Sequence, residues 1–250
     1  MAADATGLEM LEKASAVVRA LDRAGELTAA QIADETGEPV SSTYRLLANL
    51  TLIGWVDNAP RRGRFRLGVG LVRIAGMIED RLDVREASMP GLRALRASLG
   101  LTSYLCVRRG DVAVCIERLD GRDVRSLAMR VGDFLPLTTG AAPRALLAYL
   151  PEGERELVLQ SIPDPHARRA AAADVAETRA RGYSISDNDV TTGIASIGAP
   201  VFNHRGELEG AVSAGGVRAL VLDREAAVAS AVVGAAEAAS RALGHEKGDA

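Results

Sequence analysis

Side chains that can bind nucleic acid recur at helical spacing in residues 41–49. Ser41, Ser42, Tyr44, Arg45 and Asn49 supply hydroxyl groups, a guanidinium and an amide. At about 100° per residue, the two serines and Asn49 fall within roughly 60° of Arg45 on a helical wheel. Groups of these kinds bond phosphate oxygens and base edges in the major groove of DNA. We therefore expect Ser41, Ser42, Tyr44 and Arg45 to enter that groove, with Asn49 nearby.

Arginines are concentrated in the segment that follows. Residues 39–73 hold six arginines against one acidic residue, Asp57, although the whole chain has a formal net charge of −3. The run GWVDNAPRRGRFRLG, residues 54–68, predicts two short strands joined by a turn. A basic hairpin of this kind, called a wing, suits phosphates or the minor groove. We expect three arginines to project from its tip: Arg61, Arg62 and Arg64.

Two helical segments precede this surface. The first has an apolar stripe at helical spacing and should end at Gly25. Its expected inward residues are Leu8, Leu11, Val18 and Leu21. The second begins with Thr28 and Gln31, which fit a capping box, and should end near Gly37. Leu27 and Ile32 occupy the hydrophobic positions that flank such a cap.

The third helix should start at residues 39–41 and end near residue 53. Its apolar side is expected to pack inward through Thr43, Leu46, Leu50 and Ile53. Together with the wing, the pattern predicts a winged helix-turn-helix domain over residues 1–69. A winged helix can also serve only as a protein-contact module, so that alternative stays open.

The remainder predicts a linker and a larger α+β domain. An apolar stripe in residues 71–82 predicts a linker helix over residues 70–85, and the next helix is expected to be interrupted near Pro90. After it, strand-like runs alternate with helical segments, which predicts an antiparallel sheet in residues 86–250. Strands are expected at 102–120 (a hairpin), 124–132, 183–187, 194–203 and 206–216, and helices after the loop at 137–142 and over 151–162, 166–182 and 223–244.

Other classes of protein are poorly supported. Cys106 and Cys115 fall on neighbouring predicted strands, where we expect free core thiols, with a disulfide across the hairpin as the alternative. No metal-ligand spacing and no nucleophile–base pair is visible, so we expect no metal, no cofactor and no enzyme. No apolar run reaches the roughly 18 residues of a membrane span, and we expect no secretory signal, hence a cytoplasmic protein.

Several ordered segments resemble the IclR family of bacterial transcription regulators. SSTYRLLANLTLIGWV (residues 41–56) resembles the family's recognition segment, with Ser42 where threonine is usual, and GRFRLG (63–68) resembles its wing exit. MRVGDFLPLTTGAAPRALLA (129–148) and GYSISDNDVTTGIASIGAPVFNHRGELEGAVSAGG (182–216) resemble stretches of its C-terminal domain. The resemblance covers nearly the whole chain. It implies an N-terminal winged helix, a linker helix and a GAF-like effector-binding domain.

This resemblance also implies a function and its partners. Members bind double-stranded operator DNA as homodimers or dimers of dimers, and we expect a repressor rather than an activator. A small-molecule effector, often an organic or aromatic acid, binds the C-terminal domain. The matching positions here are Thr138, Gly140, Ala141, Ala142, Ser186, Asp187, Asp189, Ile194, Ser196, Ser213 and Gly215. A helix N-terminus beside hydroxyl groups suits a carboxylate, because free N–H groups and the helix dipole face the anion.

The chain departs from the family pattern in this region. Thr138 stands where histidine is usual, Pro143 and Arg144 replace Gly-Lys, and Asp189 replaces glutamate. Serine replaces cysteine at 196, and Ala-Gly-Gly replaces Ser-Gly-Pro at 214–216. The resemblance therefore fixes the fold and leaves the identity of the effector open. Two other functions remain as alternatives: a sensory module acting through a protein partner, and an enzyme on a GAF-like scaffold.

Overall fold

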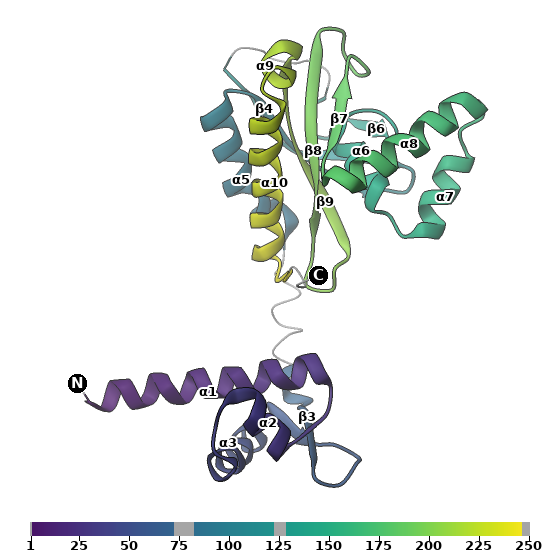
Figure 1. The fold of residues 1–250 in the computed structure, drawn as a ribbon. Coiled ribbons are helices and arrows are strands. Elements are labelled where there is room, and N and C mark those ends of the chain that lie inside the picture. The colour runs from purple at the N-terminus through teal and green to yellow at the C-terminus, as the bar shows by residue number, and fades with distance from the viewer. Residues whose placement is uncertain (1, 73–82, 123–128, 247–250) are drawn as a thin grey trace. The chain divides into compact units, whose positions relative to one another are not determined.

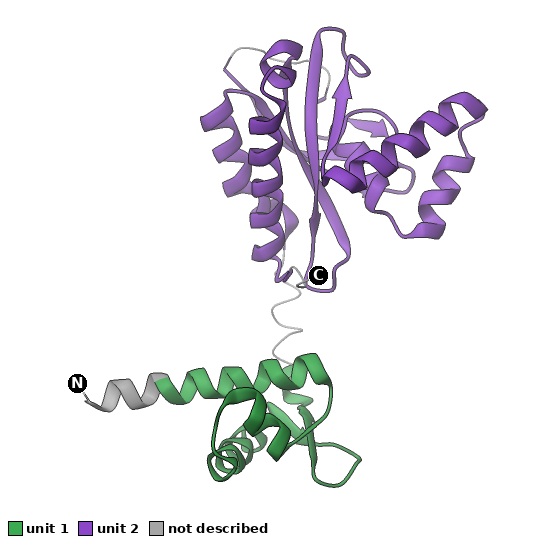
Figure 2. Cartoon of the chain, in the orientation of Figure 1, with its two compact units in different colours: residues 1–81 green, residues 82–250 purple. Residues whose placement is uncertain are grey.

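The structure is a computed structural model that describes residues 2–72, 83–122 and 129–246. The chain divides into two compact units, residues 1–81 and residues 82–250 (Figure 2). Most of the predicted linker helix, residues 73–82, lies outside the described residues. The expected domain limits of 1–69, 70–85 and 86–250 therefore stay predictions.

The first unit is a helix-turn-helix followed by a wing, as predicted (Figure 1). Its three strands form an antiparallel sheet in the order β1-β3-β2. The wing is the hairpin of β2 and β3, in which Val56 pairs with Leu67 and Asn58 with Phe65. The elements are α1 (Ala2–Ala24), β1 (Leu27–Thr28), α2 (Ala29–Thr36), α3 (Val40–Leu52), β2 (Val56–Asn58) and β3 (Arg64–Leu67).

The start and end of α2 follow the predicted signals. The Thr28 hydroxyl accepts a hydrogen bond from the Gln31 N–H at 3.3 Å, and Gln31 Oε1 accepts from the Thr28 N–H at 3.0 Å. These bonds satisfy donors that the first turn of a helix leaves open. Gly37 ends the helix in the left-handed conformation, with φ of 69°. This fixed α2 supports α3, the helix that carries the predicted DNA-reading face.

The core of the first unit corrects part of the predicted packing. Leu47 is the buried leucine at the centre of α3, whereas Ile53 is 56% exposed. The helix ends at Leu52, so Ile53 leaves the helical wheel on which the inward side was predicted. Leu11 is 67% exposed, and among residues 9–24 of α1 the first buried residue is Ala14. The expected inward positions of Leu11 and Ile53 were therefore wrong.

The second unit has a six-stranded antiparallel sheet in the order β6-β5-β4-β9-β8-β7, with helices on both faces (Figure 1). Alternate strand residues face opposite layers: Leu105 packs with α5 and α10, and Cys106 packs with α6. The strands are β4 (Thr102–Arg109), β5 (Val112–Leu119), β6 (Phe134–Pro136), β7 (Ser184–Asp187), β8 (Ile194–Phe202) and β9 (Leu208–Val217). The helices are α5 (Val84–Leu99), α6 (Ala141–Tyr149), α7 (Glu152–Gln160), α8 (Pro165–Arg181), α9 (Arg218–Leu222) and α10 (Glu225–Ala242).

Two predictions for this unit need correction. Helix α5 continues through Pro90, where an interruption was expected. Proline removes one donor there, but Asp83 caps the helix start and Leu92 and Leu95 are buried against the sheet, which holds the helix together. The expected strand at residues 124–132 lies largely outside the described residues, and 129–132 form no strand. The strand that pairs with β5 at this edge of the sheet is β6.

Candidate DNA-binding and effector sites

The outer face of α3 carries most of the predicted DNA-binding side chains. Ser41, Tyr44, Arg45 and Asn49 are exposed, whereas Ser42 is half-buried. The opposite face is anchored by Thr43, Leu47 and Leu50, which are all buried. Within the described residues, the Arg45 guanidinium makes no hydrogen bond or ion pair. The N–H groups of the Arg45 guanidinium are therefore available for a ligand, on a helix whose opposite face is buried in the domain core.

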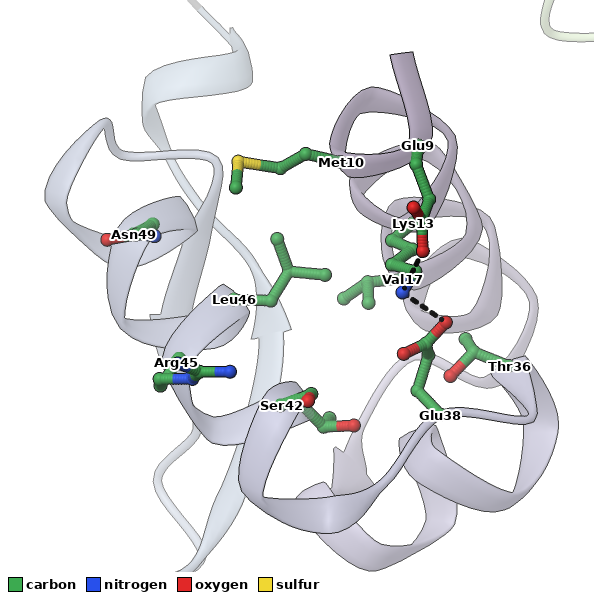
Figure 3. A pocket seen from close by; sticks show the side chains of 11 residues that line it. Glu9, Met10, Lys13, Val17, Thr36, Glu38, Ser42, Arg45, Leu46 and Asn49 are labelled. Atoms are coloured by element: carbon green, nitrogen blue, oxygen red, sulfur yellow. Dashed lines mark ion pairs between the residues drawn. The ribbon is translucent and has the colours of Figure 1, made fainter. Parts of the chain in front are cut away.

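A cavity of about 290 Å³ separates this helix from α1 (Figure 3). Three of the predicted DNA-binding residues line it from α3: Ser42, Arg45 and Asn49. From the α1 side, Lys13 Nζ lies 2.8 Å from Glu9 and 3.1 Å from Glu38. Hydrogen bonds to Glu9 and Glu38 raise the pKa of Lys13 and keep it protonated. Lys13 thus links α1 to the turn before α3. Among the described residues that line this cavity, Arg45 is the cation without such a partner.

The wing places its arginines unevenly. Arg61 and Arg62 lie in the turn between β2 and β3 and are exposed. Arg64 lies on β3, and its guanidinium donates a hydrogen bond to the Glu26 carbonyl at 3.0 Å. The expectation that Arg64 projects from the tip was therefore wrong, because this bond directs it back toward the chain before β1. Two arginines, rather than three, form the exposed tip.

A second cavity, here called the effector cavity, gathers the C-terminal segments that the sequence singled out. It has a volume of about 50 Å³ and lies between the start of α6, the end of β7 and strands β8 and β9. Eight predicted effector residues line it: Gly140, Ala141, Ala142, Ser186, Ile194, Ser196, Ser213 and Gly215. Six further described residues line it: Tyr104, Met129, Leu135, Pro143, Val190 and Thr191.

Sequence reasoning did not assign these six residues to the site. Pro143 lies on α6 beside two assigned residues, and the other five come from other strands or loops. Tyr104 faces the α6 layer by strand alternation, and that alternation was its available signal. Leu135 comes from β6, a strand that was not predicted. Val190 and Thr191 belong to the loop after β7, which has no periodic pattern. Their place in the cavity lining depends on the conformation of this loop, which the sequence pattern does not predict.

Helix α6 packs closely on the sheet beside this cavity. A Cβ atom added at Gly198 on β8 would lie 2.7 Å from the carbonyl carbon of Ala141. The Ser184 hydroxyl donates to the Ala141 carbonyl at 2.6 Å, on the same turn. Helix α6 begins at Ala141, and its N-cap residue, Gly140, makes no side-chain capping bond. Glycine at 198 lets the helix start touch the strand.

Asp189 is bonded to the start of α6 rather than lining the effector cavity. Its carboxylate accepts from the Gly140 N–H at 3.0 Å and pairs with Arg144 at 2.9 Å. It also accepts a hydrogen bond from the Ser186 hydroxyl. Arg144 further donates to the carbonyls of Thr138 and Ile185, at 3.1 and 2.9 Å. The anion that faces this helix N-terminus is therefore a side chain of the protein.

Two other predicted effector residues lie outside the cavity lining. Thr138 lines a separate hollow beside Arg144 and α8. Asp187 forms a two-pronged ion pair with Arg218, at 2.7 and 2.8 Å, and Arg218 lowers the pKa of this carboxyl. Beyond it, Asn188 adopts φ of 60° and its side chain accepts from the Gly193 N–H at 2.7 Å. Loop 188–193 is thus tied at both ends.

The two cysteines are buried and face each other across β4 and β5. Both are free thiols, as predicted. The hydrogen bond from Cys106 to Cys115, together with burial, holds the pKa of the Cys106 thiol well above its usual range. Cys106 is therefore a poor nucleophile. In the described part of the chain, no group of His, Cys, Asp and Glu side chains could hold a metal ion.

Two family models match this chain, one in its N-terminal part and one in its C-terminal part. The family model "IclR helix-turn-helix domain" matches residues 10–60, and "Bacterial transcriptional regulator IclR C-terminal" matches residues 77–241. The HTH-type transcriptional regulator XynR of Escherichia coli (strain K12) is 30% identical over 232 residues, covering 90% of this chain and 92% of that protein. The HTH-type transcriptional repressor AllR of Klebsiella pneumoniae is 28% identical, covering 84% and 80%.

Solved structures show the same architecture. The Agrobacterium tumefaciens repressor BlcR superposes with a TM-score of 0.79 at 26% identity, covering 96% of this chain and 98% of that one. Pseudomonas aeruginosa HmgR has a TM-score of 0.81 at 24% identity, covering 94% and 98%. The described helices include none long and apolar enough to cross a membrane. The matches confirm the predictions of a regulator rather than an enzyme and of the two-domain fold, and the chain belongs to the IclR family of bacterial transcriptional regulators.

Proposed function

We propose that this protein is a cytoplasmic repressor that binds operator DNA as a homodimer or dimer of dimers and responds to a small molecule held in the effector cavity. The proposal of DNA binding rests on the Arg45 guanidinium, which has no partner in the described residues and lies on the exposed face of α3. The similarity to the repressors AllR and BlcR supports the sign of regulation. The cavity at the start of α6 supports the response to a ligand.

The DNA-reading face is assigned to α3, with Ser41, Ser42, Tyr44 and Arg45 in the major groove and Asn49 nearby. Arg61 and Arg62 would hold phosphates or the minor groove from the wing tip. Arg64 can join them only with the guanidinium nitrogens that its bond to Glu26 leaves open. A two-fold dimer then favours a palindromic operator with half-sites about one helical turn, roughly 34–36 Å, apart or a multiple of it.

A gel-shift titration tests this function directly. The full chain is titrated onto the DNA that flanks its own gene, at two salt concentrations and against random competitor DNA. A repressor of this design should give a shift that weakens with salt and survives the competitor. A folded, oligomeric protein with no specific shift on that DNA or on genome-wide selected fragments would instead favour the alternative of a sensory module that acts through a protein partner.

Arg62→Ala is expected to make operator binding less sensitive to salt. Each phosphate contact contributes roughly 0.9 to the slope of log affinity against log salt, so losing one contact should flatten the slope by about that amount. The measurement is the slope across a salt series for the wild type and the variant on the same operator. Arg19→Ala, on the exposed surface of α1, is the matched control for loss of one positive charge. An equal slope for Arg62→Ala and the wild type would refute the wing model.

A further inference from the structure

We propose that a cavity at the open edge of β8, here called the β8-edge cavity, binds a small aromatic molecule that carries an N–H or O–H donor. The cavity lies in the second unit, between the last residues of β8, the C-terminal half of α10 and the residues that follow α10. None of its described lining residues also lines the effector cavity. The inference therefore concerns a second ligand site and does not depend on the proposed function.

The cavity exists because β7 covers only part of β8. The pairing of the two strands ends at Gly198, since the chain before β7 belongs to α8, which is capped at Gly182. Beyond that point the cavity is lined by three residues of β8: Ala199, Pro200 and Phe202. Helix α10 packs beside this strand (Figure 1) and lines the cavity with Val233 and Ala236. Strand and helix thus form two apolar walls.

This edge of β8 is poorly suited to a further strand. Alternate residues of a strand direct their N–H groups to the same edge. The Phe202 N–H already donates to the Ser240 hydroxyl at 3.0 Å. Pro200, two residues earlier on the same edge, has no N–H to offer. An extended peptide would therefore find no donor at either position, which favours a small molecule as the occupant.

Aromatic rings also line the cavity. The Phe202 ring meets the Tyr149 ring edge-on, with 5.5 Å between centroids, and lies 5.4 Å from the His245 ring. Such rings pack favourably against another aromatic ring, beyond the apolar area that is buried. The volume of about 500 Å³ lies within the roughly 300–1,000 Å³ that is usual for small-molecule sites. The lining therefore suits a flat aromatic ligand.

His245 supplies a hydrogen-bond acceptor to this apolar site. Its Nδ1 lies 3.1 Å from the Asn203 carbonyl oxygen, which can only accept, so Nδ1 carries the hydrogen. In the neutral ring, Nε2 is then an acceptor. Within the described residues, His245 has no other hydrogen-bond partner. The Ser240 hydroxyl, by contrast, is already bonded to Phe202 and Ala236. A ligand that donates an N–H or O–H can therefore bond Nε2.

Matched pairs of ligands separate this hydrogen bond from apolar contact. Para-cresol and para-xylene differ by a hydroxyl in place of a methyl group, and indole and benzothiophene by an N–H in place of a sulfur. Each is titrated calorimetrically into the full chain without DNA. We expect saturable binding of para-cresol or indole by the wild type.

His245→Phe tests the acceptor. The variant keeps a ring beside Phe202 but removes Nε2. It should weaken binding of the donor-bearing ligand about threefold to tenfold, the effect of losing one hydrogen bond, and change binding of its matched partner by less than about twofold. The wild type and the variant are compared for each ligand separately, because the members of a pair differ in hydration. An equal change for both members would refute the role given to His245.

Val233→Phe tests the position of the site. The larger side chain would fill the cavity from α10, so binding of every ligand should weaken about tenfold or more. Val233→Leu fills less space and provides a second variant if the phenylalanine variant unfolds, as judged by circular dichroism. Ala238→Phe is the matched control, because Ala238 is exposed on the same helix and does not line the cavity.

Three results would overturn the proposal. One is a wild type that binds neither para-cresol nor indole. Another is undiminished binding in a folded Val233 variant, which would place the ligand elsewhere. The third is a change of oligomeric state in Val233→Phe but not in Ala238→Phe, measured by size-exclusion chromatography, which would make the cavity a contact between subunits. Since the titrations contain no DNA, their outcome and that of the gel shift are independent.

Discussion

Replacing Arg45 with alanine is expected to weaken binding to the operator by about 1–3 kcal/mol, or roughly fivefold to 150-fold. Arg45 lies on the exposed face of α3 and has no protein partner in the described residues. Its removal therefore costs the folded protein little, and the loss should appear in DNA binding. The measurement is a pair of titrations, one on the operator and one on random DNA, at the same salt concentration.

The comparison with random DNA decides what Arg45 contacts. A guanidinium that bonds a guanine through two nitrogens loses more on the operator than on random DNA. Arg45→Lys keeps the charge but not the planar fork, so it should behave like the alanine variant at a base and like the wild type at a phosphate. Equal losses on both DNAs would assign Arg45 to a phosphate. No loss on either would remove it from the interface.

Gly198→Ala is expected to destabilise the second unit by about 1–3 kcal/mol, the usual cost of overfilling a packed core. The added Cβ would lie 2.7–2.9 Å from backbone atoms of Ala141 and Ala142, which cannot move without the whole start of α6. The expected result is a lower midpoint of urea unfolding by circular dichroism, with an unchanged slope. Trp55 is the single tryptophan and belongs to the first unit, so its fluorescence transition should not shift.

Gly234→Ala is the matched control for this change. Gly234 lies within α10, and a Cβ added there meets no atom within 4 Å. Alanine is favoured over glycine inside a helix, so this variant should gain about 0.5–1 kcal/mol of stability. The same added methyl group should thus act in opposite directions at the two glycines. A Gly198→Ala transition that matches the wild type would show that α6 moves off β8 without cost.

Local signals in the sequence predicted much of the first unit. The Thr28–Gln31 cap and the Gly37 stop depend on neighbours within one helical turn, and both were confirmed. The wing arginines were harder to place, because the position of Arg64 depends on the Glu26 carbonyl, 38 residues away in sequence. Ile53 was misplaced because a one-residue difference in where α3 ends decides whether that side chain faces the core.

The second unit was predictable as a pattern of elements but less so as a site. Strand and helix patterns predicted the order of β7, β8, β9 and α10, since each has its own periodicity. The partners of Asp189 could not be predicted, because Gly140 lies 49 residues away and Arg144 comes from another element. Family resemblance placed Asp189 near the ligand. It could not show that the Asp189 carboxylate is bonded to Gly140 and Arg144 at the start of α6.

The ties at both ends of loop 188–193 also affect how quickly the regulator can respond. The two-pronged Asp187–Arg218 pair and the Asp189–Arg144 pair hold the start of this loop, and the Gly193 N–H bond to the Asn188 side chain links its two ends. Val190 and Thr191, between them, line the effector cavity. Under the proposed function, a ligand that passes this loop requires these bonds to open. The lifetime of the bound state is then set by the opening of the loop as well as by contacts with the ligand. Under the proposed function, the time for which the regulator stays in its ligand-bound state therefore depends in part on these salt bridges.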